Sequence, residues 1–302
     1  MSSISTGRMI DNVSDPAKGR VVWMPAKSIW ITVMTSIAIV AGPLTFNWSA
    51  FAVFILLTAV TICLGHSVGM HRLLIHRSFS THISIEHFLV YLGTLVGMAG
   101  PFGMIYAHDI RDWAQRQRNC HDLFAHRRSF FIDAFWQMHC AVALDHPPLF
   151  VIGRASGDRF YRFLEATWMA QQLPLALLLF TLGGLPWVVW GIAARISVSL
   201  TGHWLVGHFA HRAGHQGWSV DDVAVQGYNL PRFGLVTFGE SFHGNHHAFP
   251  ESARLGIEPG QLDLGWYFIW LLASLRLASA IKLPHTIAPR RGLKRVNASD
   301  GW

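Results

Sequence analysis

The sequence predicts an all-α integral membrane protein, in which four transmembrane helices form two hairpins with a histidine-rich helical cap on the cytosolic side. Composition is the first reason: 51% of the 302 residues are hydrophobic and 14% are charged, whereas soluble proteins carry about 25% charged residues. Second, uncharged apolar runs close to the ~20 residues needed to cross a bilayer occur in pairs. Third, the 18 histidines gather in short clusters, and imidazole is the commonest metal ligand.

The first hairpin is predicted at residues 28–46 and 48–65, with the break supplied by Gly42, Pro43 and Asn47. Neither run contains a charged residue, and charge occurs only outside the two ends of the hairpin. The flanking charges are Lys18, Arg20, Lys27, Arg72 and Arg77. Because positive residues beside transmembrane helices stay in the cytoplasm, we expect both ends of this hairpin there.

A second hairpin is predicted at residues 166–183 and 185–202, joined by a Gly-Gly-Leu-Pro turn at 183–186. Residues 83–106 are apolar too, but glycines interrupt them, which favours a re-entrant or interfacial helix over a fifth span. Residues 262–277 are predicted to form another interfacial helix. With an even number of spans, all histidine clusters and both termini are expected on the cytoplasmic side.

Three segments are expected along the chain: a polar N-terminal segment at 1–27, a membrane domain with its cytosolic cap at 28–281, and a basic tail at 282–302. No small-residue cleavage site follows an early apolar core, so a removed signal peptide is not expected. We attribute the formal net charge of +7 to positive charge near membrane lipid and not to nucleic-acid binding, because no base-stacking or zinc-finger motif accompanies the tail. Three cysteines without Cys-x-x-Cys spacing predict no disulfide framework or zinc ribbon.

The strongest metal signal is the run His243-Gly-Asn-His246-His247. Offsets of three and four residues put these imidazoles on one face of a helix, and their burial without a metal would be costly. Glu240 is expected to hydrogen-bond an imidazole and fix its tautomer. A second pair, His71 and His76, follows the second span. Residues five apart on an α-helix differ by about 140°, so this pair could serve two different metal ions.

Two looser groups lie between these motifs. His121 and His126 form another pair five residues apart. His203 and His211, at the end of the fourth predicted span, lie within about 80° of each other on a helix, so both can face one site. His208 lies off that stripe and is expected at a surface or an interface. Many imidazoles with few cysteines suit iron, copper or zinc.

The order of these motifs resembles the membrane acyl desaturases of the stearoyl-CoA desaturase kind. After a span comes His71-Arg-Leu-Leu-Ile-His76-Arg-Ser-Phe, and the last motif reads Gly239-Glu-Ser-Phe-His-Gly-Asn-His-His-Ala-Phe-Pro250. The similarity runs from about residue 30 to about residue 280 and includes the two apolar hairpins.

The resemblance implies a four-helix membrane bundle with a cytosolic cap, two iron ions held by histidines, and O2 as co-substrate. It also implies the insertion of a cis double bond, by default at Δ9, into a long-chain acyl thioester or lipid. Removal of hydrogen from an unactivated methylene is beyond any unaided side chain. No fused redox segment is visible, so two electrons are expected from a separate donor of the ferredoxin, rubredoxin or cytochrome b5 type.

The central motif departs from the family pattern, in which His-x-x-His-His follows an acidic–Trp–Ala step. Here the step Asp112-Trp-Ala is followed by Gln117-Arg-Asn-Cys-His121, which keeps only the last histidine. Three explanations stay open. His126 and His203 could take over as ligands, with His108 or His139 in reserve. Cys120 could be a ligand, although its thiolate would risk oxidation, or the site could bind one metal. We favour the first, because the spare histidines lie close to the gap.

A further departure follows the fourth predicted span. The family's Asn-x3-His is represented by Gly207 and His211, so the histidine is kept and the asparagine is lost. The expected metal ligands are therefore His71, His76, His121, His126, His203, His211, His243, His246 and His247. Residues expected to support these ligands are Glu240, Asp112 and Asn245, and those expected to contact the substrate are Trp113, Arg127 and Arg128.

Two other functions are weighed against acyl desaturation. A membrane di-iron hydroxylase acting on an alkane, a lipid or a carotenoid would use the same ligands, and analysis of the product separates the two. A histidine-rich metal transporter or haem-binding membrane protein is the third reading, which metal analysis and optical spectra would test.

Overall fold

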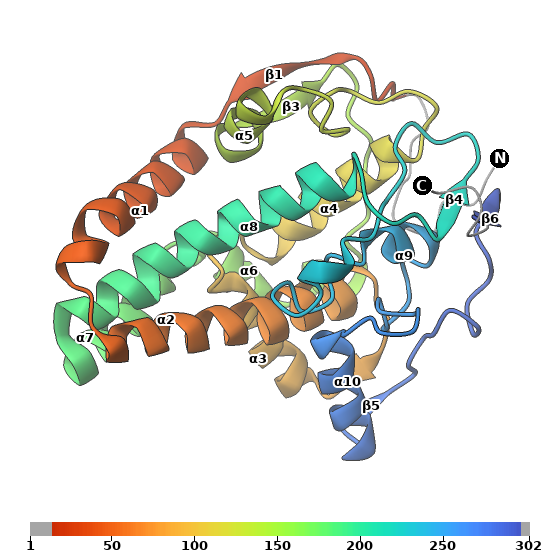
Figure 1. The fold of residues 1–302 in the computed structure, drawn as a ribbon. Coiled ribbons are helices and arrows are strands. Elements are labelled where there is room, and N and C mark those ends of the chain that lie inside the picture. Colours follow the sequence, from red (N-terminus) through yellow and green to blue (C-terminus); the bar gives the residue numbers. More distant parts are fainter. Residues whose placement is uncertain (1–13, 297–302) are drawn as a thin grey trace.

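Long helices form a bundle at the left of Figure 1, and shorter elements gather at its right-hand end. The computed structural model describes residues 14–296, so residues 1–13 and 297–302 of the predicted terminal segments lie outside it. Three two-stranded antiparallel ribbons are present among the described residues, pairing β1 with β3, β2 with β5 and β4 with β6. The strands are β1 (Gly19–Trp23), β2 (Ser80–Thr81), β3 (Cys140–Leu144), β4 (Trp218–Val220), β5 (Ala278–Ser279) and β6 (Leu293–Arg295).

The first two long helices form a hairpin with a short loop. Helix α1 (Pro25–Leu44) begins with a proline, which is suited to the first helical turn because it has no amide hydrogen to leave unsatisfied. Helix α2 (Trp48–Ala59) begins at Asn47, whose side chain accepts a hydrogen bond from the amide of Ala50 at 2.8 Å. It continues without a break into the π-helix η1 (Val60–Ile75), which gives one rod of 28 residues.

The π-helix extends ten residues beyond the predicted end of the second span at residue 65. Its glycines pack directly on the backbone of helix α3 (Ile83–Thr94). A Cβ atom at Gly65 would lie 2.4 Å from the amide nitrogen of Gly93, and one at Gly69 would lie 2.5 Å from the carbonyl oxygen of Leu89. Small residues therefore allow the two helices to touch, as they do in membrane bundles.

The apolar stretch 83–106, for which the sequence predicts a re-entrant or interfacial helix, instead contains one helix and the start of a second. Helix α3 ends at Thr94, and helix α4 (Pro101–Gln115) begins after a turn in which Gly97 adopts a left-handed φ of 80°. Neither helix is among the candidate membrane spans of the described chain. The predicted interfacial helix at 262–277 is helix α10 (Leu264–Ser274), and Asp263 accepts a hydrogen bond from the amide of Trp266 at its start.

The third long rod runs from Gln172 to Ala210, a length of 39 residues. It comprises α7 (Gln172–Val188), the π-helix η3 (Val189–Ala194) and α8 (Arg195–Ala210). Gly184 has a non-helical φ of 67° and ψ of −162°, so the rod is two helices joined at a kink, where the sequence predicts the turn of the second hairpin.

Three helices among the described residues are thus long and apolar enough to cross a membrane. Large apolar side chains on them are exposed, among them Val40 (65%), Leu177 (66%) and Phe180 (58%). Apolar surface of this kind suits contact with lipid. The chain is therefore a mainly helical, membrane-associated protein.

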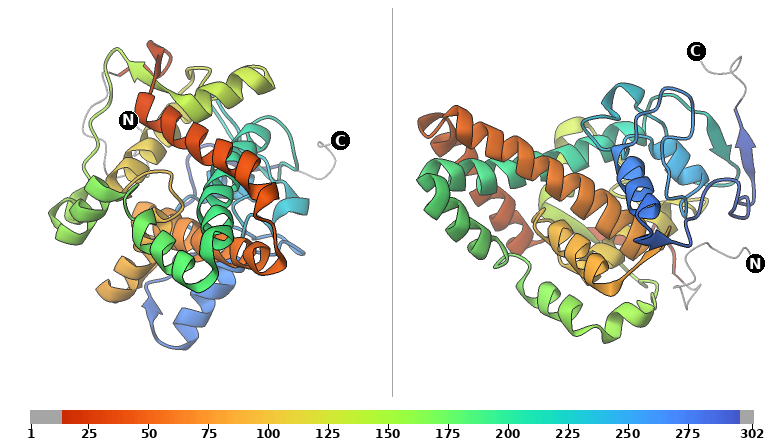
Figure 2. Two further views of the ribbon diagram at one scale, coloured as in Figure 1. Left: turned by 90° about the vertical axis from the view of Figure 1, so that its left-hand side faces the viewer. Right: turned by 90° about the horizontal axis from the view of Figure 1, so that it is seen from below.

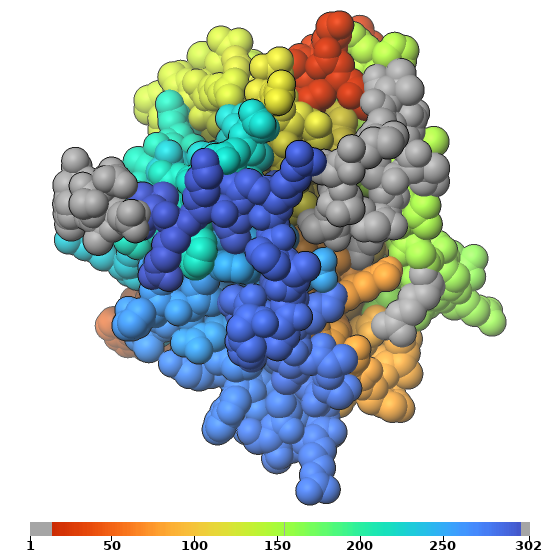
Figure 3. Space-filling view, turned by 90° about the vertical axis from the view of Figure 1, so that its right-hand side faces the viewer, coloured from red at the N-terminus to blue at the C-terminus, as the bar shows by residue number. Residues whose placement is uncertain are grey.

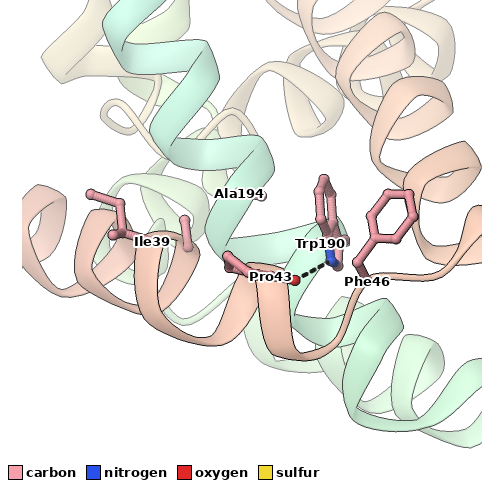
Figure 4. Close-up of a pocket in the computed structure, with 7 residues that line it drawn as sticks. Ile39, Pro43, Phe46, Trp190 and Ala194 are labelled. Carbon is pink, nitrogen blue, oxygen red and sulfur yellow. Dashed lines mark hydrogen bonds between the residues drawn. The ribbon is translucent and has the colours of Figure 1, made fainter.

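A shallow apolar groove of about 500 Å³ lies between α1 and η3 (Figure 4). It is lined in part by Ile39, Pro43, Phe46 and Trp190, and the indole of Trp190 donates a hydrogen bond to the carbonyl of Gly42 at 3.2 Å. No histidine within residues 14–296 lines this groove.

The remaining elements cover the other end of the bundle (Figure 2). They are α5 (Phe130–His139), η2 (Gly153–Gly157), α6 (Arg159–Thr167), η4 (Pro231–Phe233) and α9 (His243–Ala248). The C-terminal part of the chain lies across the middle of this face (Figure 3).

Candidate metal centre

Four helices bring histidines together at the capped end of the bundle. They are η1, which carries His71, α4, α8 and the short helix α9. Figure 1 shows the ends of these helices converging on the side away from the α1–α2 loop. Residues from positions 71 to 247 are thereby gathered into two compact groups, each with nitrogen atoms within 4.8 Å of one another.

The first group consists of His71, His76, His108 and His246. The Nε2 atoms of His76 and His108 lie 3.1 Å apart, and the rings of His71 and His246 have centroids 4.6 Å apart. The sequence led us to expect that His71 and His76 point apart, as they would on an α-helix. In the structure the amide of His76 donates to the carbonyl of His71, five residues back, so the π-turn brings the two rings to 4.8 Å.

The second group consists of His211, His243 and His247. Their Nε2 atoms form a triangle: 3.0 Å from His243 to His211, 3.3 Å from His211 to His247, and 3.2 Å from His247 to His243. The Nδ1 atom of His211 lies 2.7 Å from the carbonyl oxygen of Gly207. Because that oxygen can only accept, His211 carries its proton on Nδ1 and turns a lone pair on Nε2 toward the triangle.

This geometry fits a bound metal. Imidazole nitrogens bind a metal such as zinc at about 2.1 Å, so neighbouring ligands on one ion lie roughly 3.0–3.4 Å apart. The triangle of the second group has these dimensions. The buried Nδ1 atom of His246 has no hydrogen-bond partner within the described part of the chain. Two sets of converging imidazoles suit iron or another first-row transition metal.

Burial keeps these histidines in the neutral form that binds metal. It lowers the pKa of His243 to about 3 and lowers the pKa of His246 and His247 well below the usual histidine value. Burial likewise lowers the pKa of His211, and the neighbouring His243 lowers it further. At neutral pH protons therefore do not compete for these nitrogens.

Glu240 and Arg72 tie the first group to the last motif. Glu240 Oε2 lies 2.8 Å from Nδ1 of His71, and its Oε1 accepts a hydrogen bond from the hydroxyl of Ser67 at 2.5 Å. Burial alone would raise the pKa of Glu240, but His71 and Arg72 hold that pKa well below its usual range. Arg72 donates to Asp263 at 2.8 Å, so a buried ion pair extends from the π-helix to α10.

A third group combines His126, Asp133 and His208. Asp133 Oδ2 lies 2.9 Å from Nδ1 of His126 and 2.7 Å from Nδ1 of His208. The indole nitrogen of Trp204 donates to the same oxygen at 2.8 Å. The sequence predicts His208 at a surface or an interface; in the structure it is buried against this carboxylate.

Two predicted ligands lie outside all three groups of the described chain. The Nδ1 atom of His121 accepts a hydrogen bond from the amide of Leu123, and its ring packs near Trp136. His203 stands edge to face with His66, with ring centroids 5.1 Å apart. Cys120 is a buried free thiol, and burial raises its pKa to about 12, which disfavours a thiolate ligand.

Apart from Glu240, the predicted supporting residues and the predicted substrate residues make contacts outside the histidine groups. Asp112 is paired with Arg116 at 2.5 Å, and Asn245 donates to the carbonyl of Leu255 at 2.7 Å and to Gln261. Trp113 is buried in an apolar cluster with Leu123 and Phe124. Arg127 donates to the carbonyl of Ala224, and Arg128 pairs with Asp122 and lies over the ring of Trp136.

Two site residues were not predicted as such. The sequence offers His108 only as a reserve ligand, although it lies four residues before Asp112 and therefore on the same face of α4. Asp133 was missed. The signal that could have found it is an acidic residue inside the apolar run Phe-Phe-Ile-Asp-Ala-Phe-Trp, since ionisable groups in such surroundings are functional candidates.

The fold and the histidine groups define a membrane-associated protein with a candidate multi-histidine metal centre. No protein-family model matches the chain, but several curated proteins are similar to it. Acyl-CoA 5-desaturase AL21 of Anemone leveillei is 35% identical over 258 residues, which cover 83% of this chain and 77% of that protein. The sn-1 stearoyl-lipid 9-desaturase of Anabaena variabilis is 35% identical over 251 residues, covering 80% and 87%.

A third relative is named for a different double-bond position. The chloroplastic palmitoyl-monogalactosyldiacylglycerol delta-7 desaturase of Arabidopsis thaliana is 30% identical over 299 residues, covering 94% of this chain and 77% of that protein. The chain therefore belongs to the fatty-acyl desaturase family and is an oxidoreductase of lipid metabolism.

Proposed function

We propose that the protein inserts a cis double bond into a long-chain saturated acyl group, using O2 and two external electrons at a histidine-held di-iron centre. The observation that carries this is the pair of histidine groups, each with at least three imidazoles drawn from two or more helices, at one end of an apolar bundle. Family membership supports the reaction class. Relatives are named for acyl-CoA and for acyl-lipid substrates, so the acyl group is the common element.

The two groups would each hold one iron. His71, His76, His108 and His246 would hold the first, and His211, His243 and His247 the second. The irons would supply the activation of O2 that removal of hydrogen from a methylene requires. Glu240 holds the proton of His71 on Nδ1, and the carbonyl of Gly207 does the same for His211, so that both Nε2 atoms face inward.

The membrane arrangement belongs to the same proposal. The kink at Gly184 divides the third rod into two helices, and if each of them crosses the membrane the chain would have four spans in two hairpins. The histidines and both termini would then lie on the cytoplasmic side, because positive residues flank the first hairpin there. The net charge of +7 suits a separate acidic electron donor such as a ferredoxin, a rubredoxin or a cytochrome b5.

Expression in a host fed saturated fatty acid tests the proposal. Membranes with confirmed iron loading should contain a new monounsaturated acid, and mass spectrometry should locate its double bond. We expect Δ9, while the names of relatives also include Δ5 and Δ7. The control is His246→Ala at equal expression, which removes a buried residue of the first group and should form no product.

Two outcomes would contradict desaturation. A hydroxylated product without an alkene would identify a hydroxylase built on the same histidines. Iron-loaded membranes that form neither product would exclude both reactions for acyl chains.

A further inference from the structure

The backbone and ring of His126 are held in an unusual way. The residue is fully buried and has a left-handed φ of 52°, a conformation that costs energy for a residue with a side chain. Its Nδ1 faces Asp133 at 2.9 Å, while its buried Nε2 has no hydrogen-bond partner in the described part of the chain. A buried nitrogen without a partner is costly. Strain and an unsatisfied atom in one side chain point to a ligand-binding role.

Asp133 is a hydrogen-bond acceptor here and not a metal ligand. The same oxygen receives the indole N–H of Trp204, which can only donate, at 2.8 Å. His126 and His208 also approach this oxygen through Nδ1. The Nε2 atom of His208 is already occupied by Arg212 at 3.2 Å. The carboxylate therefore fixes the proton of His126 on Nδ1 and leaves its Nε2 with a lone pair, as in carboxylate–histidine–metal arrangements.

Gly207 provides the room for this ring. A Cβ atom at position 207 would lie 3.1 Å from Nε2 and 3.2 Å from Cε1 of His126. The ring of His126 is stacked on that of His211, with centroids 5.2 Å apart and planes 8° apart. His211 belongs to the second histidine group, which has three imidazoles where the first has four. His126 therefore lies directly beside the second group, which has one imidazole fewer than the first.

We propose that His126 is the fourth imidazole of the second metal group, with Asp133 as its positioning residue and Gly207 as the residue that admits it. The inference rests on the proposed function. It accounts for two departures of this chain together: the central segment is depleted of histidine, and position 207 is a glycine. His211, His243 and His247 would hold the metal together with His126, whose ring lies against that of His211.

Counting metal tests the inference without measuring activity. The full chain in detergent is reconstituted anaerobically with ferrous iron, and iron per chain is measured by mass spectrometry after removal of the excess. The parent protein should hold about two ions and His126→Ala about one, because three imidazoles retain an ion far less tightly than four. The matched control is His121→Ala, from the same segment but outside the groups, which should keep about two.

Imidazole separates a ligand from a merely structural residue. The space left in His126→Ala lies beside Gly207, so added imidazole should restore the second ion there and have no effect on His121→Ala. Asp133→Asn keeps the size of the side chain and should weaken the second iron about 10- to 100-fold while two ions still bind at saturation. Gly207→Ala retains every proposed ligand, but its added methyl group would crowd the ring of His126, so this variant should also bind the second iron more weakly.

The outcomes distinguish the two proposals. A parent protein that binds no iron would overturn both this inference and the proposed function. Two tightly bound ions in His126→Ala, or equal losses in His126→Ala and His121→Ala, would overturn the role of His126 alone. If His126→Ala fails to fold, unchanged iron affinity in both Gly207→Ala and Asp133→Asn would do the same.

Discussion

At the scale of single residues, Glu240 links the first histidine group to the rest of the fold. Its carboxylate contacts His71 at 2.8 Å and Ser67 at 2.5 Å, and Arg72 lies 3.5 Å away. Inside a protein such hydrogen bonds are stronger than in water, and a carboxylate that accepts from a ligating imidazole raises the basicity of that ligand. Glu240 therefore sets both the tautomer and the orientation of His71.

Glu240→Gln should weaken the first iron about 10- to 100-fold, because the amide keeps the size of the side chain but loses the negative charge. Titration of the stripped protein with ferrous iron measures the effect. The matched control is Glu251→Gln, which removes a carboxylate that pairs with Lys282 at the surface and should leave iron affinity unchanged. Equal affinities in the two variants would show that Glu240 does not support a metal ligand.

At the scale of elements, the π-helix η1 shows where sequence periodicity misleads. The apolar run correctly predicts a long apolar helix, and the small residues within it are visible in the sequence. The five-residue spacing of His71 and His76 has no common face on an α-helix. In the π-helix the two histidines share a face, because the backbone hydrogen bond of this turn spans five residues and not four. Such turns often occur at functional sites. The local sequence does not predict this change from an α-helix to a π-helix.

Gly65→Ala should destabilise the fold by about 1–3 kcal/mol, since the added methyl group meets the backbone of α3 and the helices must move apart. Gly202→Ala in α8 is the control, because nothing lies within 4 Å of its Cβ position. Alanine has the higher helix propensity, so this control should be stabilised by about 0.5–1 kcal/mol. Unfolding by denaturant in detergent measures both. Two variants of equal stability would contradict the close contact of η1 with α3.

At the scale of the whole molecule, hydropathy predicts the long helices, and histidine spacing predicts the last motif. The sequence could not show which histidines meet. His108 joins His71 because α4 returns across η1, and His121 stays outside because its ring packs near Trp136. These contacts between histidines depend on how α4 and α8 pack in the folded protein. The spacing of histidines along the chain does not predict that packing.

The same long-range assembly predicts that the stability of the fold depends on bound metal. The histidine groups join η1, α4, α8 and α9, which are far apart in the unfolded chain, so an ion should bind the folded state much more tightly. At free iron 100-fold above the dissociation constant, one site stabilises the fold by about 2.7 kcal/mol. Treatment with an iron chelator should therefore lower the unfolding midpoint in detergent, and added iron should restore it. His243→Ala should reduce this iron-dependent shift, whereas Lys282→Ala, at a surface ion pair, should leave it intact. A midpoint that does not change while bound iron is lost would mean that no metal joins these helices.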